Sequence, residues 1–191
     1  MCGIVGYVGD RNILSVLIVG LERLSYRGYD SAGVAIVSDD EISVWKKPGK
    51  VHVLAKELES KSIDGNAGVG HTRWATHGIP NEVNSHPHFD AKRRFSVVHN
   101  GIIENYLQLK SELVKEGFLF RSQTDSETIV HLIDKYYNGS LIEAVQKAVS
   151  RLEGSFAICV VSAFDANCMV VARKNSPLII GVGKNENYVS S

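Results

Sequence analysis

The chain opens with Met1-Cys2-Gly3-Ile4-Val5-Gly6, which places a thiol directly before an apolar stretch. Residues 3–8 are typical of a strand, and a methionine before a small residue is commonly removed. Removal would put a thiol and a free α-amine on Cys2. An α-amine has a pKa of about 7.7–8.0 and can accept the proton of a thiol, whose pKa is ordinarily about 8.5. The opening therefore predicts a first strand preceded by a nucleophile with its own base. The alternative is that Cys2 is only a small apolar side chain at the start of a strand and has no catalytic role.

Composition and charge narrow the class of protein. Of 191 residues, 44% are hydrophobic, which favours a packed core over disorder. The 21 basic and 21 acidic residues balance, so nucleic acid and anionic membrane surfaces are not expected as partners. The sequence contains no apolar run long enough to span a membrane and no signal-peptide pattern. Three cysteines do not make a disulfide framework, and we expect a cytoplasmic protein without a cofactor.

Hydrophobic periodicity divides the chain into alternating groups of strands and helices. A glycine-rich loop is expected at 26–33, a polar loop at 71–88, and a strand that ends at Asn100-Gly101. Two capping-box patterns, Thr124-x-x-Glu127 and Ser140-x-x-Glu143, open two of the helices. Short hairpin-linked strands with grouped helices predict one α+β domain with antiparallel sheets. The expected strands are 3–8, 33–38, 42–46, 67–70, 95–99, 155–162, 168–173 and 177–181, and the expected helices are 12–24, 51–59, 105–116 and two that start at Thr124 and Ser140.

Asn100-Gly101 is the first candidate partner of the thiol. A thiolate that attacks an amide needs hydrogen-bond donors where the carbonyl oxygen becomes negative. An asparagine side chain beside an unhindered glycine N–H supplies two such donors. The alternative is an ordinary Asn-Gly turn, but Ile102-Ile103-Glu104-Asn105 leads into a helix instead of resuming an alternating strand.

A second cluster, His71 to Gly78, concentrates polar side chains that could bind a carboxylate. Arg73 can hold a carboxylate through two hydrogen bonds, and a hydroxyl and an imidazole from Thr76 and His77 can complete the site. The alternative is a solvated strand end anchored by Trp74. Asp125 is either a favourable charge in the first turn of a helix or a ligand for a substrate ammonium group, and the residues alone leave both open.

The histidines suggest two further roles. His86-Pro87-His88 could ligate a metal with His77 or Cys2, but no full ligand set is present, and no metal is expected. A Cys–His dyad is the stronger rival to the α-amine as activator of Cys2.

Taken together, these motifs resemble the glutaminase domain of the class II glutamine amidotransferases, which belong to the N-terminal-nucleophile hydrolases. Several separated motifs agree in order, and the resemblance covers essentially the whole chain. The residues that carry it are Cys2 to Gly6, Tyr26-Arg27-Gly28-Tyr29-Asp30-Ser31-Ala32-Gly33, Gly70 to Gly78, Asn84 to His88, and His99-Asn100-Gly101-Ile102-Ile103-Glu104-Asn105.

The resemblance implies a four-layer αββα sandwich of mainly antiparallel sheets, with Cys2 as nucleophile once Met1 is gone. It implies that Asn100 and Gly101 form the oxyanion hole. It further implies that the glutamine carboxylate is held by Arg73, Thr76 and His77 and the ammonium by Asp125, under a loop that contains Trp74.

Within the family, the chain most resembles members that pass ammonia to a sugar-isomerase domain acting on fructose 6-phosphate. That part is missing here, and the resemblance implies that the glutaminase domain, residues 1–191, is truncated at its C-terminal end. The full-length protein is expected to be a homo-oligomer. The alternatives are a class II amidotransferase with another acceptor domain, a thiol hydrolase with a Cys–His dyad, and a catalytically silent binding domain.

Overall fold

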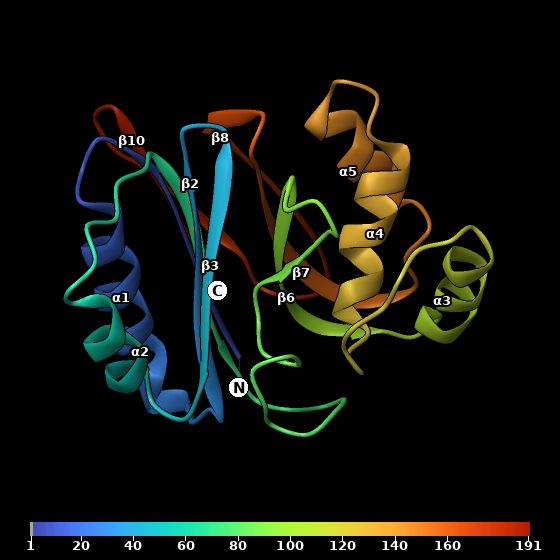
Figure 1. The fold of residues 1–191 in the computed structure, drawn as a ribbon, viewed down its shortest axis with the longest axis horizontal. Coiled ribbons are helices and arrows are strands. Elements are labelled where there is room, and N and C mark those ends of the chain that lie inside the picture. Colours follow the sequence, from blue (N-terminus) through green and yellow to red (C-terminus); the bar gives the residue numbers. More distant parts are fainter. Residues whose placement is uncertain (1) are drawn as a thin grey trace.

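The computed structural model describes residues 2–191, which form four layers (Figure 1). Helices α1 (Ile13–Leu24) and α2 (Val51–Leu58) cover one face of a six-stranded sheet. The other face of this sheet packs on a four-stranded sheet. Helices α3 (Tyr106–Lys115), α4 (Ser126–Tyr136) and α5 (Leu141–Val149) lie on the far side of the second sheet. The predicted αββα sandwich is confirmed.

Every pairing between named strands is antiparallel. The six-stranded sheet has the order β3 (Glu41–Pro48), β2 (Ser31–Ser38), β4 (Ala67–Arg73), β1 (Gly3–Gly9), β10 (Glu186–Ser190) and β9 (Ile179–Val182). The four-stranded sheet has the order β5 (His88–Phe89), β6 (Phe95–Ile103), β7 (Gly154–Ser162) and β8 (Asp165–Lys174).

Three separate apolar clusters hold the four layers together. One lies between α1, α2 and the first sheet and contains Leu17, Leu21 and Leu54. The second lies between the sheets and is built from smaller side chains such as Val69 and Ala157. The third packs α3, α4 and α5 on the second sheet. Because the central strands of both sheets are covered on both faces, most of their side chains are apolar, with a few buried polar residues such as His71 and His99 among them.

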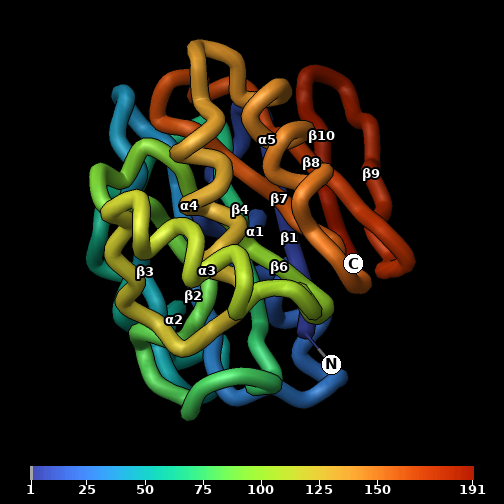
Figure 2. Tube along the Cα trace, turned by 90° about the vertical axis from the view of Figure 1, so that its right-hand side faces the viewer, coloured from blue at the N-terminus to red at the C-terminus, as the bar shows by residue number. Residues whose placement is uncertain are grey.

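The two ends of the described chain lie side by side. β1 pairs with β10 with Val5 opposite Ser190, and the Ser191 N–H donates to the carbonyl of Ile4 at 3.3 Å. Figure 2 shows β1 and β10, from opposite ends of the sequence, within one layer of the molecule. Cys2 precedes β1, so this arrangement brings the last residues of the chain close to the predicted nucleophile.

Most predicted elements are confirmed, including the first helix, which starts at Ile13 with Asn12 as its N-cap. The side chain of Asn12 accepts a hydrogen bond from the Ser15 N–H at 2.8 Å. The expected strands at 33–38 and 42–46 form a hairpin, and Asp39 and Asp40 between them are both at positive φ, as a tight turn requires. The final strand, β10, lies beyond the last of the strands expected above.

Three predicted boundaries are wrong because distant strands extend the pairing. β2 begins at Ser31, inside the predicted loop, because Ser31 pairs with β3 on one side and β4 on the other. β4 continues through Arg73 instead of entering a loop at His71. β6 continues past Asn100-Gly101 to Ile103 because β7 pairs with it along its whole length.

The capping box predicted at Thr124 is also wrong. α4 starts at Ser126, and its N-cap residue Asp125 makes no side-chain capping bond. The Glu127 carboxylate instead accepts hydrogen bonds from the N–H groups of Arg121 and Ser122. Burial alone would raise the pKa of Glu127, but the neighbouring His131 ring and hydrogen bonds from Ser122 and the Arg121 main chain lower it to about 2. Glu127 therefore fixes the segment before the helix and not the helix end.

Of the capping box predicted at Ser140, the bond made by the Ser140 side chain is confirmed and the return bond of Glu143 is not. The Ser140 hydroxyl accepts from the Glu143 N–H at 3.4 Å, whereas the Glu143 carboxylate accepts from the side chain of Asn138. Among the described residues, no helix is long and apolar enough to cross a membrane.

Candidate active site

All eight residues predicted for the site line one pocket of about 590 Å³. The pocket lies where the residue before β1, the loop after β4, the C-terminal part of β6 and the start of α4 come together. The predicted residues at the pocket are Cys2, Arg73, Trp74, Thr76, His77, Asn100, Gly101 and Asp125. Segments far apart in the sequence thus meet at one end of the sandwich.

Cys2 is partly exposed in this pocket, and its thiol contacts main chain. Its Sγ accepts a hydrogen bond from the N–H of Trp74 at 3.2 Å. Burial raises the pKa of the Cys2 thiol, although the Trp74 N–H and the charge of Arg73 oppose the shift. The thiol is therefore protonated at neutral pH and needs a proton acceptor before it can attack. Met1, whose removal the sequence predicts, lies outside the described residues.

The described histidines do not form the dyad considered from sequence. His86 and His99 line the pocket, but the hydrogen bonds of Cys2 go to the main chain of Trp74 alone. His99 Nδ1 is 2.8 Å from the hydroxyl of Ser126. Burial lowers the pKa of His99 and lowers that of His86 well below the ordinary value, so both imidazoles are neutral.

Four histidines pack together beneath the pocket. The ring centroid of His86 lies 4.2 Å from that of His71 and 4.6 Å from that of His88, and His99 lies further off at 6.4 Å. Among the described residues, no group of three or more His, Cys, Asp or Glu side chains is arranged to hold a metal ion.

Asn100 and Gly101 lie next to each other on β6. The Asn100 side-chain oxygen is 2.9 Å from His71 Nε2, and its nitrogen donates to the Ser191 hydroxyl at 2.9 Å. Gly101 has φ 121°, and a Cβ there would lie 2.0 Å from the carbonyl oxygen of Ser155. Only glycine fits this position, so a backbone free of side chain reaches the pocket beside a carboxamide.

Arg73 and Asp125 provide opposite charges, and both are 3% exposed. Arg73 Nη2 donates to the carbonyls of His77 and Gly78, which closes the loop around the guanidinium. The carboxylate of Asp125 accepts from the N–H of Ile103 at 2.8 Å. Buried opposite charges within one pocket can orient a zwitterionic ligand.

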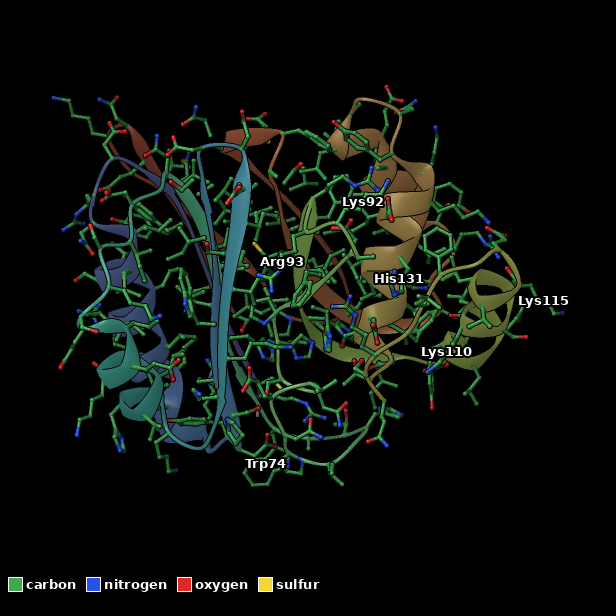
Figure 3. All side chains as sticks on the ribbon, in the orientation of Figure 1. Trp74, Lys92, Arg93, Lys110, Lys115 and His131 are labelled. Carbon is green, nitrogen blue, oxygen red and sulfur yellow. The ribbon has the colours of Figure 1, made fainter. Side chains whose placement is uncertain are left out.

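The loop after β4 carries the three remaining predicted residues. The Thr76 hydroxyl is 3.3 Å from His77 Nδ1, and the His77 ring packs edge-on against Tyr106. Trp74 is 55% exposed, and Figure 3 shows it at the lower edge of the molecule. A Cβ at Gly28 would lie 2.9 Å from the Trp74 ring, so this glycine allows the indole to pack on the chain.

Sequence reasoning assigned no role to Asp30, which the structure places at the base of this loop. Its carboxylate accepts hydrogen bonds from the Ala75 N–H and the Ser31 hydroxyl. Its main-chain N–H donates to the carbonyl of Arg73 at 2.7 Å. The signal was present in the sequence, since Asp30 is the one acid of the glycine-rich motif 26–33.

Comparisons with known proteins agree with this geometry. A family model described as a glutamine amidotransferase domain matches residues 71–191. Glutamine–fructose-6-phosphate aminotransferase (isomerizing) of Aquifex aeolicus (strain VF5) is 54% identical over 191 residues, which cover 100% of this chain and 32% of that protein. The chain therefore spans about a third of the length of this relative.

Solved structures show the same fold. Glutamine phosphoribosylpyrophosphate amidotransferase from B. subtilis superposes with a TM-score of 0.85 at 25% identity, over 99% of this chain and 41% of that one. A structure described as the allosteric regulatory enzyme of purine biosynthesis superposes with a TM-score of 0.87 at 27% identity, over 100% of this chain and 42% of that one. From the family match and the identity to the Aquifex protein, we conclude that this chain belongs to the glutamine amidotransferase domain family.

Proposed function

We propose that this chain hydrolyses the side-chain amide of L-glutamine through a thioester on Cys2, releasing glutamate and ammonia. One observation carries the proposal. A single pocket holds a partly exposed thiol, a carboxamide beside a glycine, and buried charges of opposite sign. A thiol hydrolase of neutral amides needs the first two, and an amino acid substrate needs the third.

The first step is activation and attack. After loss of Met1, the α-amine of Cys2, directly or through one water, takes the thiol proton. The thiolate then bonds to the side-chain carbonyl carbon, and the π electrons move to the oxygen. Asn100 Nδ2 and the Gly101 N–H stabilise that oxyanion, each by about 3–4 kcal/mol in comparable sites.

The second step releases ammonia and then glutamate. The protonated amine gives its proton to the leaving nitrogen as the C–N bond breaks, which leaves a γ-glutamyl thioester on Cys2. Water, deprotonated by the same amine, attacks the thioester carbonyl, and the C–S bond breaks. Glutamine and water are thus converted to glutamate and ammonia, and the thiol is restored.

Binding of glutamine is assigned to the two charged ends of the pocket. We assign the substrate carboxylate to Arg73, with Thr76 and His77, and the ammonium to Asp125. Arg73 Nη1 supports this assignment, because it is buried, lies 4.0 Å from Asp30 Oδ1 and makes no hydrogen bond with the described residues. Trp74 would close over the bound amino acid from its exposed position.

The function of the whole protein is proposed from its relatives. They are named for transfer of the amide nitrogen of glutamine to fructose 6-phosphate, which supports a sugar-isomerase domain as the acceptor of ammonia and glucosamine 6-phosphate as the product. Residues 1–191 would be most of the glutaminase domain of such a homo-oligomeric enzyme. Three free cysteines support a place in the cytoplasm.

The test is glutamine hydrolysis by the chain after Met1 removal. We expect equimolar glutamate and ammonia from the parent and none above background from Cys2→Ala. Blocking Met1 removal should abolish turnover as well, whereas a Cys–His enzyme would remain active. A folded, processed chain that releases no ammonia would overturn the proposal.

A further inference from the structure

His71 and Asn100 connect the two sheets beneath the pocket. His71 lies on β4 of the first sheet and is 0% exposed, and Asn100 lies on β6 of the second. His71 Nε2 and Asn100 Oδ1 are 2.9 Å apart. Neither the charge pattern nor the motif spacing of the sequence assigns His71 a role, and the mechanism above does not use it.

The orientation of the Asn100 carboxamide decides what it offers to a substrate. Its Nδ2 donates to the hydroxyl of Ser191, which lines the pocket together with Cys2. If the amide were turned by half a rotation, its oxygen would take this position. An oxygen there would repel the negative charge that develops on the substrate carbonyl, instead of stabilising it. The group bonded to Oδ1 therefore selects between a productive and an unproductive rotamer.

His71 is suited to make this selection only when Nε2 carries its proton. Burial lowers the pKa of His71 to about 3, although its contacts with Asn100 and the His99 main chain oppose the shift. At neutral pH the ring is uncharged and has a single N–H. An amide oxygen can only accept a hydrogen bond, so the nitrogen that lies 2.9 Å from Asn100 Oδ1, Nε2, is the one that carries the proton. A proton on Nε2 points at Asn100 Oδ1.

The surroundings hold the His71 ring in place. His86 packs on it with the ring centroids 4.2 Å apart. His86 reaches this position because a Cβ at Gly33 would lie 2.1 Å from the His86 carbonyl oxygen, so only glycine allows its main chain to come so close. The donor on His71 is thus fixed by packing of the segment before β5 on the first sheet.

We propose that His71 is a positioning residue, whose Nε2–H holds Asn100 Oδ1 so that Asn100 Nδ2 faces the reacting carbonyl. The inference rests on the proposed glutaminase reaction and adds to it the group that orients the oxyanion hole. A substitution that removes the donor lets the carboxamide rotate. The site then stabilises the transition state less, while its binding of the substrate changes little.

The kinetic test uses three variants on the processed chain. His71→Leu should lower kcat for glutamine hydrolysis by about tenfold to a hundredfold and change KM by less than about threefold. His71→Gln, which can still donate to Asn100, should recover a large part of the loss. His52→Leu is the control, since His52 is an exposed histidine on α2 outside the pocket and its loss should leave kcat unchanged.

A double-mutant cycle tests whether His71 acts through Asn100. His71→Leu combined with Asn100→Ala should be no slower than Asn100→Ala alone, within about twofold. Losses that multiply would overturn the proposal, because His71 would then act independently of Asn100. Equal losses in His71→Leu and His71→Gln would overturn it too.

Nitrogen NMR of the His71 ring gives a readout that needs no turnover and no variant. We expect a neutral ring with the proton on Nε2 between pH 6 and 8. A proton on Nδ1 would overturn the inference even in a chain that hydrolyses glutamine. Conversely, the expected tautomer in a chain that releases no ammonia would contradict the proposed function and leave the geometry of His71 intact.

Discussion

The thiol of Cys2 accepts a hydrogen bond from the main-chain N–H of Trp74, with Sγ and N 3.2 Å apart. This contact ties the nucleophile to the loop that carries Thr76 and His77. The same loop is held by the Asp30 carboxylate at Ala75 and by the Arg73 guanidinium at His77. The position of the thiol and the shape of the substrate-binding loop are therefore coupled, because three side chains bond to main-chain groups of the same loop.

The first prediction concerns Asp30, which anchors the loop. In Asp30→Asn one carboxylate oxygen becomes an NH2 group, so the Ala75 N–H and the Ser31 hydroxyl can no longer both find an acceptor. We expect KM for glutamine to rise by about tenfold, the cost of losing one charged hydrogen bond. Steady-state glutaminase assays measure this change. Asp39→Asn, at an exposed turn, is the control. An unchanged KM in Asp30→Asn would show that Asp30 does not hold the loop in its binding conformation.

A second prediction separates the two roles of Asp125. Asp125→Asn keeps an oxygen that can accept from the Ile103 N–H but removes the charge proposed to bind the ammonium group. KM for glutamine should rise by about tenfold or more with little change in the free energy of unfolding. Asp125→Ala should in addition lose about 1–3 kcal/mol of stability, because the Ile103 N–H is left buried and unpaired. Kinetics and urea unfolding of both variants test the split, and equal stability losses would contradict it.

Two glycines at positive φ should respond very differently to alanine. Gly101 has φ 121° and a Cβ there would overlap the Ser155 carbonyl, whereas Gly117 has φ 94° and no atom within 4 Å of an added Cβ. Gly117→Ala should cost about 1–2 kcal/mol, the price of the backbone conformation alone. Gly101→Ala should cost about 3 kcal/mol or more and abolish turnover. Similar unfolding midpoints for the two variants would refute the steric argument.

The sequence predicted most helices and strands well because each is encoded locally, whereas the four-layer arrangement was implied by the family resemblance. The helix at 12–24 and the hairpin around Asp39 depend on periodicity and turn residues that lie next to each other in the chain. The boundaries that were wrong depend on remote partners. β6 extends to Ile103 only because β7 pairs with it, and Glu127 leaves its expected capping role because the segment at Arg121 and Ser122 offers it better donors.

The site shows the same division. Residues whose chemistry is visible in their own motif, such as Cys2, Arg73 and Asn100, were predicted and line one pocket. Asp30 and His71 were not assigned roles, because each acts through a hydrogen bond to a residue on another element. A carboxylate or an imidazole in a motif indicates polarity, but its partner is set by the packing of the two sheets.

The buried histidines predict an acid-sensitive fold. Burial lowers the pKa values of His71, His86, His88 and His99, that of His71 to about 3. On unfolding each returns to about 6.5, so below that pH the unfolded chain binds protons that the folded chain does not. The free energy of unfolding should therefore fall as the pH drops below 6.5, and the contribution of His71 continues down to about pH 3.

Urea unfolding at pH 7.5, 6.5 and 5.5 measures this dependence. Stability should fall slightly between pH 7.5 and 6.5, where about half of the unfolded imidazoles become protonated, and more steeply between pH 6.5 and 5.5. His52→Gln, at an exposed position, should leave the profile unchanged, whereas His86→Leu should make it shallower. A chain equally stable at pH 5.5 and 7.5 would show that these rings become charged without unfolding.

The most direct measurement is the intact mass of the folded chain before and after reaction with an electrophilic glutamine analogue. The account predicts a mass lacking Met1, a single adduct that maps to Cys2, and no adduct when Met1 is retained. A processed, folded chain that forms no adduct, or a chain that reacts equally well with Met1 in place, would contradict it.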